Sequence, residues 1–92
     1  MKNTYLPTLK QLQYLLALHE KRHFGRAAES CYVSQSTLSA GIRELESLLG
    51  VTLVERTRRV VRFTPLGERV VDKAHVLLRE AEELAELVQS AG

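Results

Sequence analysis

The side chains best suited to recognise another molecule lie within residues 26–43, RAAESCYVSQSTLSAGIR. Four small or uncharged residues of this segment share one face of a predicted helix: Gln35, Ser36, Ser39 and Ala40. A Gln amide can bond two polar atoms of an adenine edge at once, a Ser hydroxyl can donate or accept, and an Ala methyl can meet the methyl group of thymine. This row is typical of a helix that reads bases in the DNA major groove, and we expect all four residues to do so.

Two guanidinium groups, at Arg26 and Arg43, flank the row. Arginines at such positions suit phosphates, which supply affinity but carry no direct sequence information. Ser34 is predicted to be the N-cap of the helix, because its hydroxyl can accept a backbone N–H two or three residues further on. The alternative is a solvated helix face that binds nothing, since helix-turn-helix patterns also occur as plain helical corners.

Three apolar patterns must position these side chains. A first helix is predicted over 9–21, after a capping box that begins at Thr8. Its expected core residues are Leu9, Leu12, Leu15, Leu16 and His19. A support helix follows, with a turn at 31–33, and its apolar face comprises Phe24, Ala27, Ala28 and Cys31. The back of the reading helix is a stripe that ends before Gly50 and contains Leu38, Ile42, Leu45, Leu48 and Leu49.

After Gly50 the period changes to that of extended chain. The runs 51–54 and 60–63 are rich in β-branched residues and predict two short strands. The polar residues between them include Arg56, Arg58 and Arg59, which we expect to contact the DNA backbone or minor groove beside the site read by the helix. The alternative is a basic hairpin that is merely solvated.

A long helix is predicted from Pro65, with Thr64 as its N-cap. Apolar residues recur along it in alternating steps of four and three, as in a coiled coil: Val70, Ala74, Leu77, Ala81, Leu84 and Val88. So small a body cannot bury this whole stripe, which predicts a homodimer interface. The alternative is an amphipathic helix packed only on its own domain.

Charge order along the long helix indicates how two copies would pair. Basic residues lie early and acidic residues late, so an antiparallel mate brings unlike charges together. With a two-fold axis between Leu77 and Leu78, Arg69 would approach Glu86 of the other copy. Exposed pairs of this kind contribute about 0.5 kcal/mol each, so they set orientation while apolar burial provides affinity.

Composition limits the architecture. Ninety-two residues with 45% apolar content suit one small domain, residues 1–64, followed by the helix of residues 65–92. Residues 1–64 hold ten Lys and Arg against five acids, and residues 65–92 hold three against six. No apolar run approaches the roughly 18 residues that span a membrane, so we expect a cytoplasmic protein. We expect no cofactor and no metal, because His19, His23 and Cys31 lack a fourth ligand at suitable spacing.

The order of these elements, with RAAESCYVSQSTLSAGIRELESLLGVTLVER and then FTPLGE opening a long helix, closely resembles the N-terminal DNA-binding domain of LysR-type transcriptional regulators. The segment RHFGRAAESCYVSQSTLS is most similar to the OxyR subgroup of peroxide-responsive activators. The resemblance implies a mainly α fold with a small β-wing: a winged helix-turn-helix and a long linker helix that pairs antiparallel in a dimer on double-stranded DNA.

The resemblance also implies roles for individual residues. Thr37 joins Arg26, Ser34 and Arg43 at backbone-binding positions, and Arg56 lies on the wing. Two residues depart from the family pattern: Ser36 stands where Pro is common, and Ala40 where a longer polar or basic residue is frequent. An effector-binding domain beyond the chain's C-terminus would sense a ligand or redox signal and would permit tetramers.

Two other functional classes remain open. A protein-interaction module would use the coiled-coil helix for docking and would not retain DNA at moderate salt. A small enzyme would need a convergent acid, base or nucleophile, and Ser34, Ser36 and Ser39 have no nearby His in the sequence.

Overall fold

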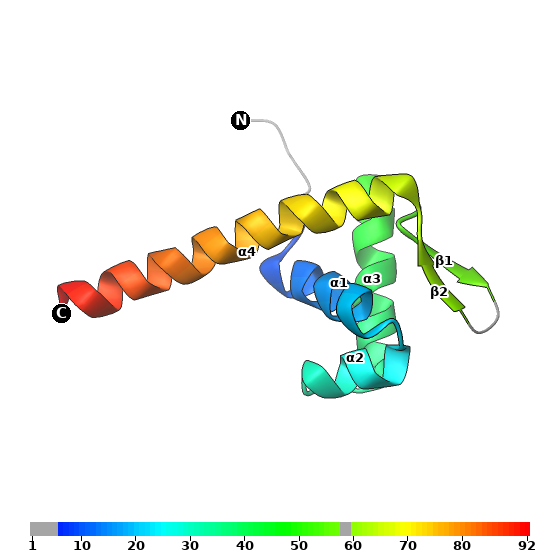
Figure 1. The fold of residues 1–92 in the computed structure, drawn as a ribbon, viewed down its shortest axis with the longest axis horizontal. Coiled ribbons are helices and arrows are strands. Elements are labelled where there is room, and N and C mark those ends of the chain that lie inside the picture. Colours follow the sequence, from blue (N-terminus) through cyan, green and yellow to red (C-terminus); the bar gives the residue numbers. More distant parts are fainter. Residues whose placement is uncertain (1–5, 58–59) are drawn as a thin grey trace.

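The computed structural model describes residues 6–57 and 60–92. The elements follow the order α1 (Leu9–Lys21), α2 (Phe24–Ser30), α3 (Gln35–Leu49), β1 (Val54–Thr57), β2 (Val60–Phe63) and α4 (Pro65–Ala91). Three short helices and an antiparallel hairpin form the body, and α4 projects from it as a long arm (Figure 1). This confirms the predicted fold class, a winged helix-turn-helix followed by a long helix.

Local hydrogen bonds begin the helices where the sequence predicts. The hydroxyls of Thr8, Ser34 and Thr64 accept backbone N–H groups of Gln11, Thr37 and Gly67 at 3.1, 3.1 and 2.9 Å. Each bond satisfies an amide that has no partner within its helix. At the other end of α3, Gly50 adopts φ +73°, the left-handed conformation that closes a helix and favours glycine.

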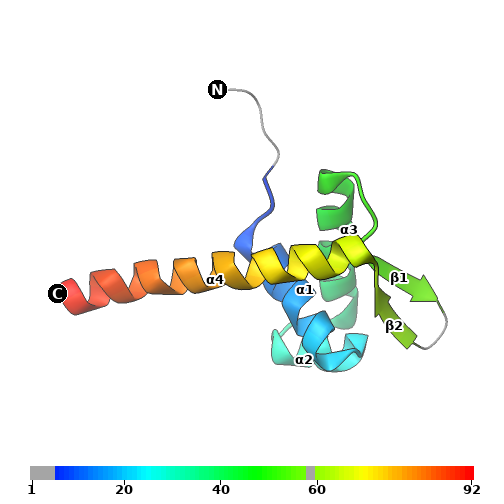
Figure 2. The ribbon, with the colours of Figure 1, turned by 45° about the horizontal axis from the view of Figure 1, so that its top comes forward.

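The hydrophobic core surrounds α1, which contacts α2, α3 and α4 (Figure 2). Its buried residues are Leu12, Tyr14, Leu15, Leu18, Ala27, Ala28, Leu38, Ile42, Leu45, Leu53, Val54, Val71 and Ala74. The Tyr14 ring lies directly over Gly41, where an added Cβ would come within 2.5 Å of it. The missing side chain therefore lets α3 pack closely on α1.

Two residues that were predicted to lie in the core, Leu9 and Leu49, are exposed, so that part of the prediction is wrong. Leu9 is 48% exposed and Leu49 is 38% exposed. Both lie in a terminal turn, Leu9 in the first turn of α1 and Leu49 in the last turn of α3, beyond the neighbouring helices. The sequence also misses Tyr14 and Leu18, because three helices pack around α1 and bury more of its circumference than one stripe predicts.

The first strand begins at Val54, not at Val51 as predicted. The N–H groups of Leu53 and Val54 both donate to Glu46 Oε2, at 2.8 and 3.0 Å, so the chain before the strand is held against α3. β1 then pairs with β2 from Val54 opposite Phe63 to Thr57 opposite Val60. β-propensity alone could not indicate this, because the anchoring carboxylate lies on another element.

Only the first half of α4 packs on the body. Val71 and Ala74 are buried, whereas Leu84, Leu87 and Val88 are each about two-thirds exposed, at 65%, 64% and 66%. The helix therefore carries its second half away from the core (Figure 1). None of the helices in residues 6–57 and 60–92 combines the length and apolar character needed to cross a membrane.

Candidate nucleic-acid interface

The polar face of α3 is open to solvent. Gln35, Ser36, Ala40 and Arg43 are exposed, and Ser39 is half-buried at the edge of the face. On the opposite side, Leu38, Ile42 and Leu45 are fully buried and hold the helix on the core. The structure thus brings together all the base-reading candidates on one surface, and α3 presents them from a rigid support.

A cluster of hydroxyls organises the first turn of α3. Ser34 Oγ lies 2.9 Å from Thr37 Oγ1 and 3.1 Å from Ser36 Oγ, in addition to accepting the Thr37 N–H. All three side chains are exposed. The hydroxyl of Ser36 therefore joins the helix cap, which a proline at that position could not do.

Side chains of α2 border this surface. Arg26 is exposed on α2, and a Cβ added at Gly25 would lie 3.5 Å from Gln35 Oε1. The amide of Gln35 therefore lies beside the first turn of α2. Guanidinium groups on both helices, Arg26 and Arg43, are available to phosphates on either side of it.

Arg56 does not display its charge as the sequence predicts. Its Nη1 donates to Glu46 Oε1 at 3.0 Å, and its side chain is only 23% exposed. Its Nε and Nη2 are buried and have no hydrogen-bond partner among the described residues. In this structure Arg56 therefore holds the wing against α3, and its contact with DNA stays a prediction. Arg58 and Arg59 lie outside the described residues.

Glu46 is a site residue that the sequence analysis missed. Burial by itself raises the pKa of the Glu46 carboxyl, but hydrogen bonds from the Val54 and Leu53 amides and from Arg56 outweigh it, and the pKa lies below its ordinary value. The sequence contained one indication of this role: Glu46 lies four residues after Ile42, at the edge of the apolar stripe of α3. A carboxylate at such a half-buried position needs hydrogen-bond donors from the protein.

A second missed cluster holds the wing from the other side. His19 Nε2 lies 2.9 Å from Glu68 Oε1, and Arg22 Nη2 lies 3.7 Å from Glu68 Oε2. Both basic side chains also contact the ring of Phe63 on β2. The centroids of the His19 and Phe63 rings are 4.8 Å apart in an edge-on arrangement, and Arg22 Cζ lies 5.2 Å from the Phe63 centroid. Side chains at the end of α1 therefore pack against the second wing strand, and Glu68 at the start of α4 holds them in position.

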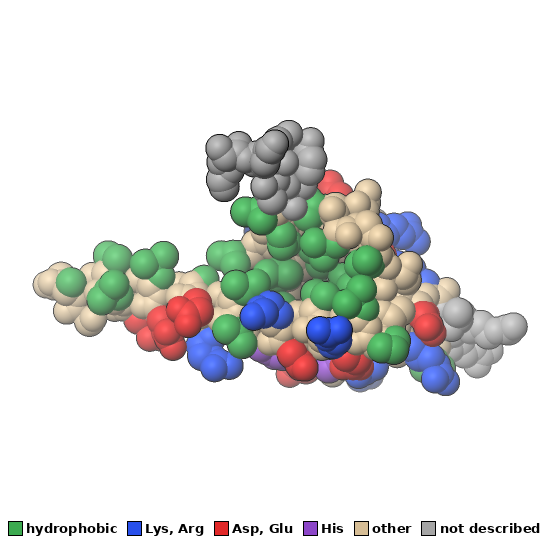
Figure 3. All heavy atoms as spheres, turned by 90° about the horizontal axis from the view of Figure 1, so that it is seen from above, with side chains coloured by type: hydrophobic (Ala, Val, Ile, Leu, Met, Phe, Trp, Pro, Cys, Tyr) green, Lys and Arg blue, Asp and Glu red, His purple; other side chains and the backbone are tan. Residues whose placement is uncertain are grey.

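The predicted dimer stripe on α4 divides into two parts. Ala74 is 1% exposed, so this predicted interface residue is covered by the chain's own core, whereas Val70 is only half-buried against that core. Ala81 is half-buried, whereas Leu77, Leu84 and Val88 are exposed, as is Leu87, which the prediction omitted. Figure 3 shows apolar side chains gathered along one side of the projecting arm, with charged groups on the other.

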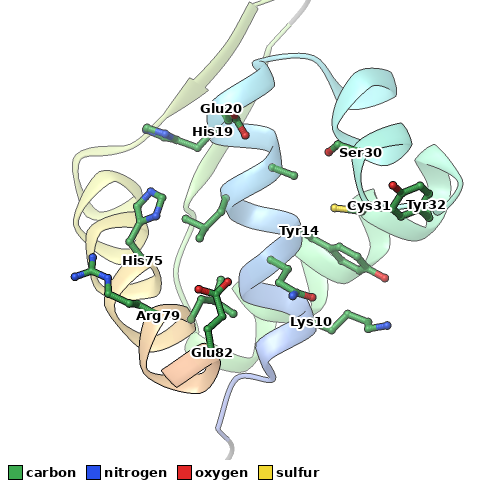
Figure 4. Close-up of a pocket in the computed structure, with 14 residues that line it drawn as sticks. Lys10, Tyr14, His19, Glu20, Ser30, Cys31, Tyr32, His75, Arg79 and Glu82 are labelled. Carbon is green, nitrogen blue, oxygen red and sulfur yellow. The ribbon is translucent and has the colours of Figure 1, made fainter. Parts of the chain in front are cut away.

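An open groove of about 890 Å³ runs along α1 (Figure 4). Cys31 and Tyr32 lie on one side of α1, and His75, Arg79 and Glu82 of α4 lie on the other. Because α1 separates the thiol from the imidazole of His75, these two groups do not form a nucleophile and base pair.

Comparisons with known proteins agree with this architecture. Residues 9–68 match the family described as bacterial regulatory helix-turn-helix protein, lysR family. The chain is 58% identical over 82 residues to the HTH-type transcriptional regulator EstR of Acinetobacter baylyi, covering 89% of this chain and 27% of that protein. It is 54% identical over 84 residues to the DNA-binding transcriptional dual regulator OxyR of Escherichia coli, covering 91% and 28%.

Among solved structures, the chain resembles the DNA-binding domain of BenM in a complex with benA site 1 DNA. The TM-score is 0.86 at 32% identity, with 91% of this chain and 94% of that chain covered. The chain spans about a quarter of the length of the two regulators it matches, at 27% and 28%. On the family match and these identities, the chain belongs to the LysR family of bacterial regulatory helix-turn-helix proteins.

Proposed function

We propose that this chain is the sequence-specific DNA-binding domain of a LysR-type transcriptional regulator, and that α3 enters the major groove. The observation that carries the proposal is the exposed, uncharged face of α3, with Gln35 at its first turn, set on a fully buried apolar back. Gln35, Ser36 and Ser39 read base edges there, and the small Ala40 contributes only a methyl contact. The DNA complex of the related BenM domain supports this assignment.

Phosphate contacts surround the reading helix in this proposal. Arg26 and Arg43 neutralise phosphates, while the hydroxyls of Ser34 and Thr37 border the backbone at the helix start, where Thr37, which accepts from Ser34, is the one with a hydrogen to donate. On the wing, the exposed Arg62 belongs to the same basic cluster as Arg56 and is the better placed of the two to reach a phosphate. Arg58 and Arg59 remain sequence-based predictions of contacts with the DNA backbone or the minor groove.

Dimerisation through α4 would place two copies of α3 in successive major grooves of an interrupted dyad. The exposed residues of the arm, Leu77, Leu84 and Val88, form the contact, with Leu87 added from the structure. The chain has acids late on α4 and bases early, which favours an antiparallel mate. An exposed apolar row of this kind is unusual on a monomer and supports a partner helix.

The full regulator is proposed to be an OxyR-like cytoplasmic activator. The support is the 54% identity to the E. coli OxyR protein over 84 residues. In this proposal a domain outside the 92 residues senses the effector ligand or redox signal, and full-length subunits assemble further into tetramers.

Selection of bound fragments from a random DNA pool tests the proposed function. The expected result is a pair of inverted half-sites at fixed spacing. Fluorescence anisotropy with the selected duplex and with a scrambled duplex, at several salt concentrations, then measures specificity. Recovery of no sequence, with no DNA retained at moderate salt, would favour the protein-interaction module instead.

A further inference from the structure

We propose that His23 is a DNA-backbone contact, donating from Nε2 to a phosphate beside the bases that Gln35 reads. The inference rests on the proposed DNA-binding function and adds a residue that neither the sequence pattern nor the comparisons assign. It starts from the position of His23 at the N-cap of α2, where its Nδ1 accepts the N–H of Arg26 at 3.1 Å.

The cap bond determines where the imidazole carries its proton. A backbone N–H is always a donor, so Nδ1 must be the unprotonated acceptor and the neutral ring holds its hydrogen on Nε2. His23 is exposed, and none of residues 6–57 and 60–92 forms a hydrogen bond with its Nε2. The ring therefore offers a fixed donor to solvent or to a ligand.

Gly25 brings this donor next to the reading helix. A Cβ built on Gly25 would lie 3.1 Å from His23 Cε1 and 3.5 Å from Gln35 Oε1. The His23 imidazole and the Gln35 side-chain amide therefore both lie next to the α-carbon of Gly25, which carries no side chain. A Cβ at this position would press on the ring, which would have to move by a few tenths of an ångström.

The ligand that fits the donor is a phosphate oxygen of the duplex. When Gln35 meets a base edge in the major groove, the sugar-phosphate backbone forms the groove's border, and phosphate oxygens only accept hydrogen bonds. Arg22, the nearest cation before His23, already contacts Glu68 and the Phe63 ring. His23 therefore supplies a neutral hydrogen-bond donor at the border of the groove, where Arg26 supplies a positive charge.

The test separates the cap from the phosphate contact. His23→Ser keeps a strong N-cap but has no group at the position of Nε2. With a duplex selected by the wild-type chain, we expect the same thermal unfolding midpoint and about five- to tenfold weaker binding. Because a neutral donor releases no counterion, the slope of log Kd against log salt should stay unchanged. The matched Arg26→Ala variant should lower that slope by about 0.9.

Single methylphosphonate substitutions in the selected duplex locate the phosphate. One position should weaken the wild type and leave His23→Ser unaffected. Wild-type affinity for His23→Ser, or equal losses for both proteins at every position, would overturn the inference. If His23→Ser unfolds, the same duplex series with His23→Thr, which also keeps an N-cap hydroxyl and has no group at the position of Nε2, gives the equivalent comparison. A wild-type chain that selects no duplex would instead overturn the proposed function.

Discussion

Arg56 Nη1 lies 3.0 Å from Glu46 Oε1, and this ion pair joins the reading helix α3 to the first strand of the wing. The other carboxylate oxygen accepts the amides of Leu53 and Val54, so one side chain holds three donors. With side-chain exposures of 12% for Glu46 and 23% for Arg56, the pair is largely withdrawn from water. The orientation of the wing relative to α3 therefore depends on it.

Arg56→Ala should destabilise the fold by about 2 kcal/mol, because Glu46 loses a partner in a largely buried site. The matched control is Arg62→Ala, which removes an exposed arginine from the other wing strand. Thermal unfolding should show a lower midpoint for Arg56→Ala only, and DNA titrations should show a lower salt slope for Arg62→Ala. An unchanged midpoint with a reduced slope for Arg56→Ala would instead support the predicted direct contact of Arg56 with DNA.

Acid should weaken the same anchor. The folded-state pKa of Glu46 is lowered, so the carboxylate contributes stability that is fully present above its unfolded pKa of about 4.3 and is lost as pH falls through the folded value. Denaturant unfolding of wild type and Glu46→Gln should therefore show a difference in unfolding free energy that shrinks below about pH 4.3. A difference that is constant from neutral pH to pH 3 would contradict this account.

Gly67→Ala should be strongly destabilising. A Cβ at Gly67 would come within 2.2 Å of the Leu53 carbonyl oxygen, so α4 must shift away from the body, at a cost of about 3 kcal/mol or more. Gly50→Ala is the control, because nothing lies within 4 Å and only the left-handed φ of +73° opposes it, worth about 1 kcal/mol. Equal unfolding midpoints for the two variants would show that the contact with Leu53 is relaxed in solution.

Gln35→Ala should weaken binding to the selected duplex more than binding to a scrambled one, since a bidentate base contact contributes about 1–3 kcal/mol of discrimination. Anisotropy titrations on both duplexes at one salt concentration measure it. The exposed Glu44, on the same helix but outside the base-reading row, provides the control as Glu44→Ala. Equal losses on the two duplexes for Gln35→Ala would remove its base-reading role.

Cysteine cross-linking should reveal the direction of α4 pairing. In a chain whose single cysteine is changed by Cys31→Ser, Leu77→Cys lies near the proposed two-fold axis and should form a disulfide-linked dimer under mild oxidation. Val88→Cys should not, because in an antiparallel pair it faces the start of the other helix. Non-reducing electrophoresis reads out both, and efficient linkage through Val88→Cys would indicate a parallel pair.

Local sequence determined much of this protein. The caps at Thr8, Ser34 and Thr64 and the turn at Gly50 depend on bonds within a few residues, so α1, α3 and α4 begin, and α3 ends, as predicted. The exposed face of α3 follows from helical period for Ser36, Ala40 and Arg43, which lie opposite the buried stripe. Gln35, three residues before Leu38, is exposed at the first turn of the helix.

Tertiary packing decided the roles of Arg56, Ala74 and Val54. Arg56 is basic in a basic segment, and only the approach of Glu46 from α3 turns it inward. Ala74 fits a dimer stripe equally well by spacing, but α1 covers it first. The strand starts at Val54 because a carboxylate eight residues earlier takes its amide. In each case the contact that decides the role comes from another element. The residue pattern of one helix or strand does not show which side chains of other elements will pack against it.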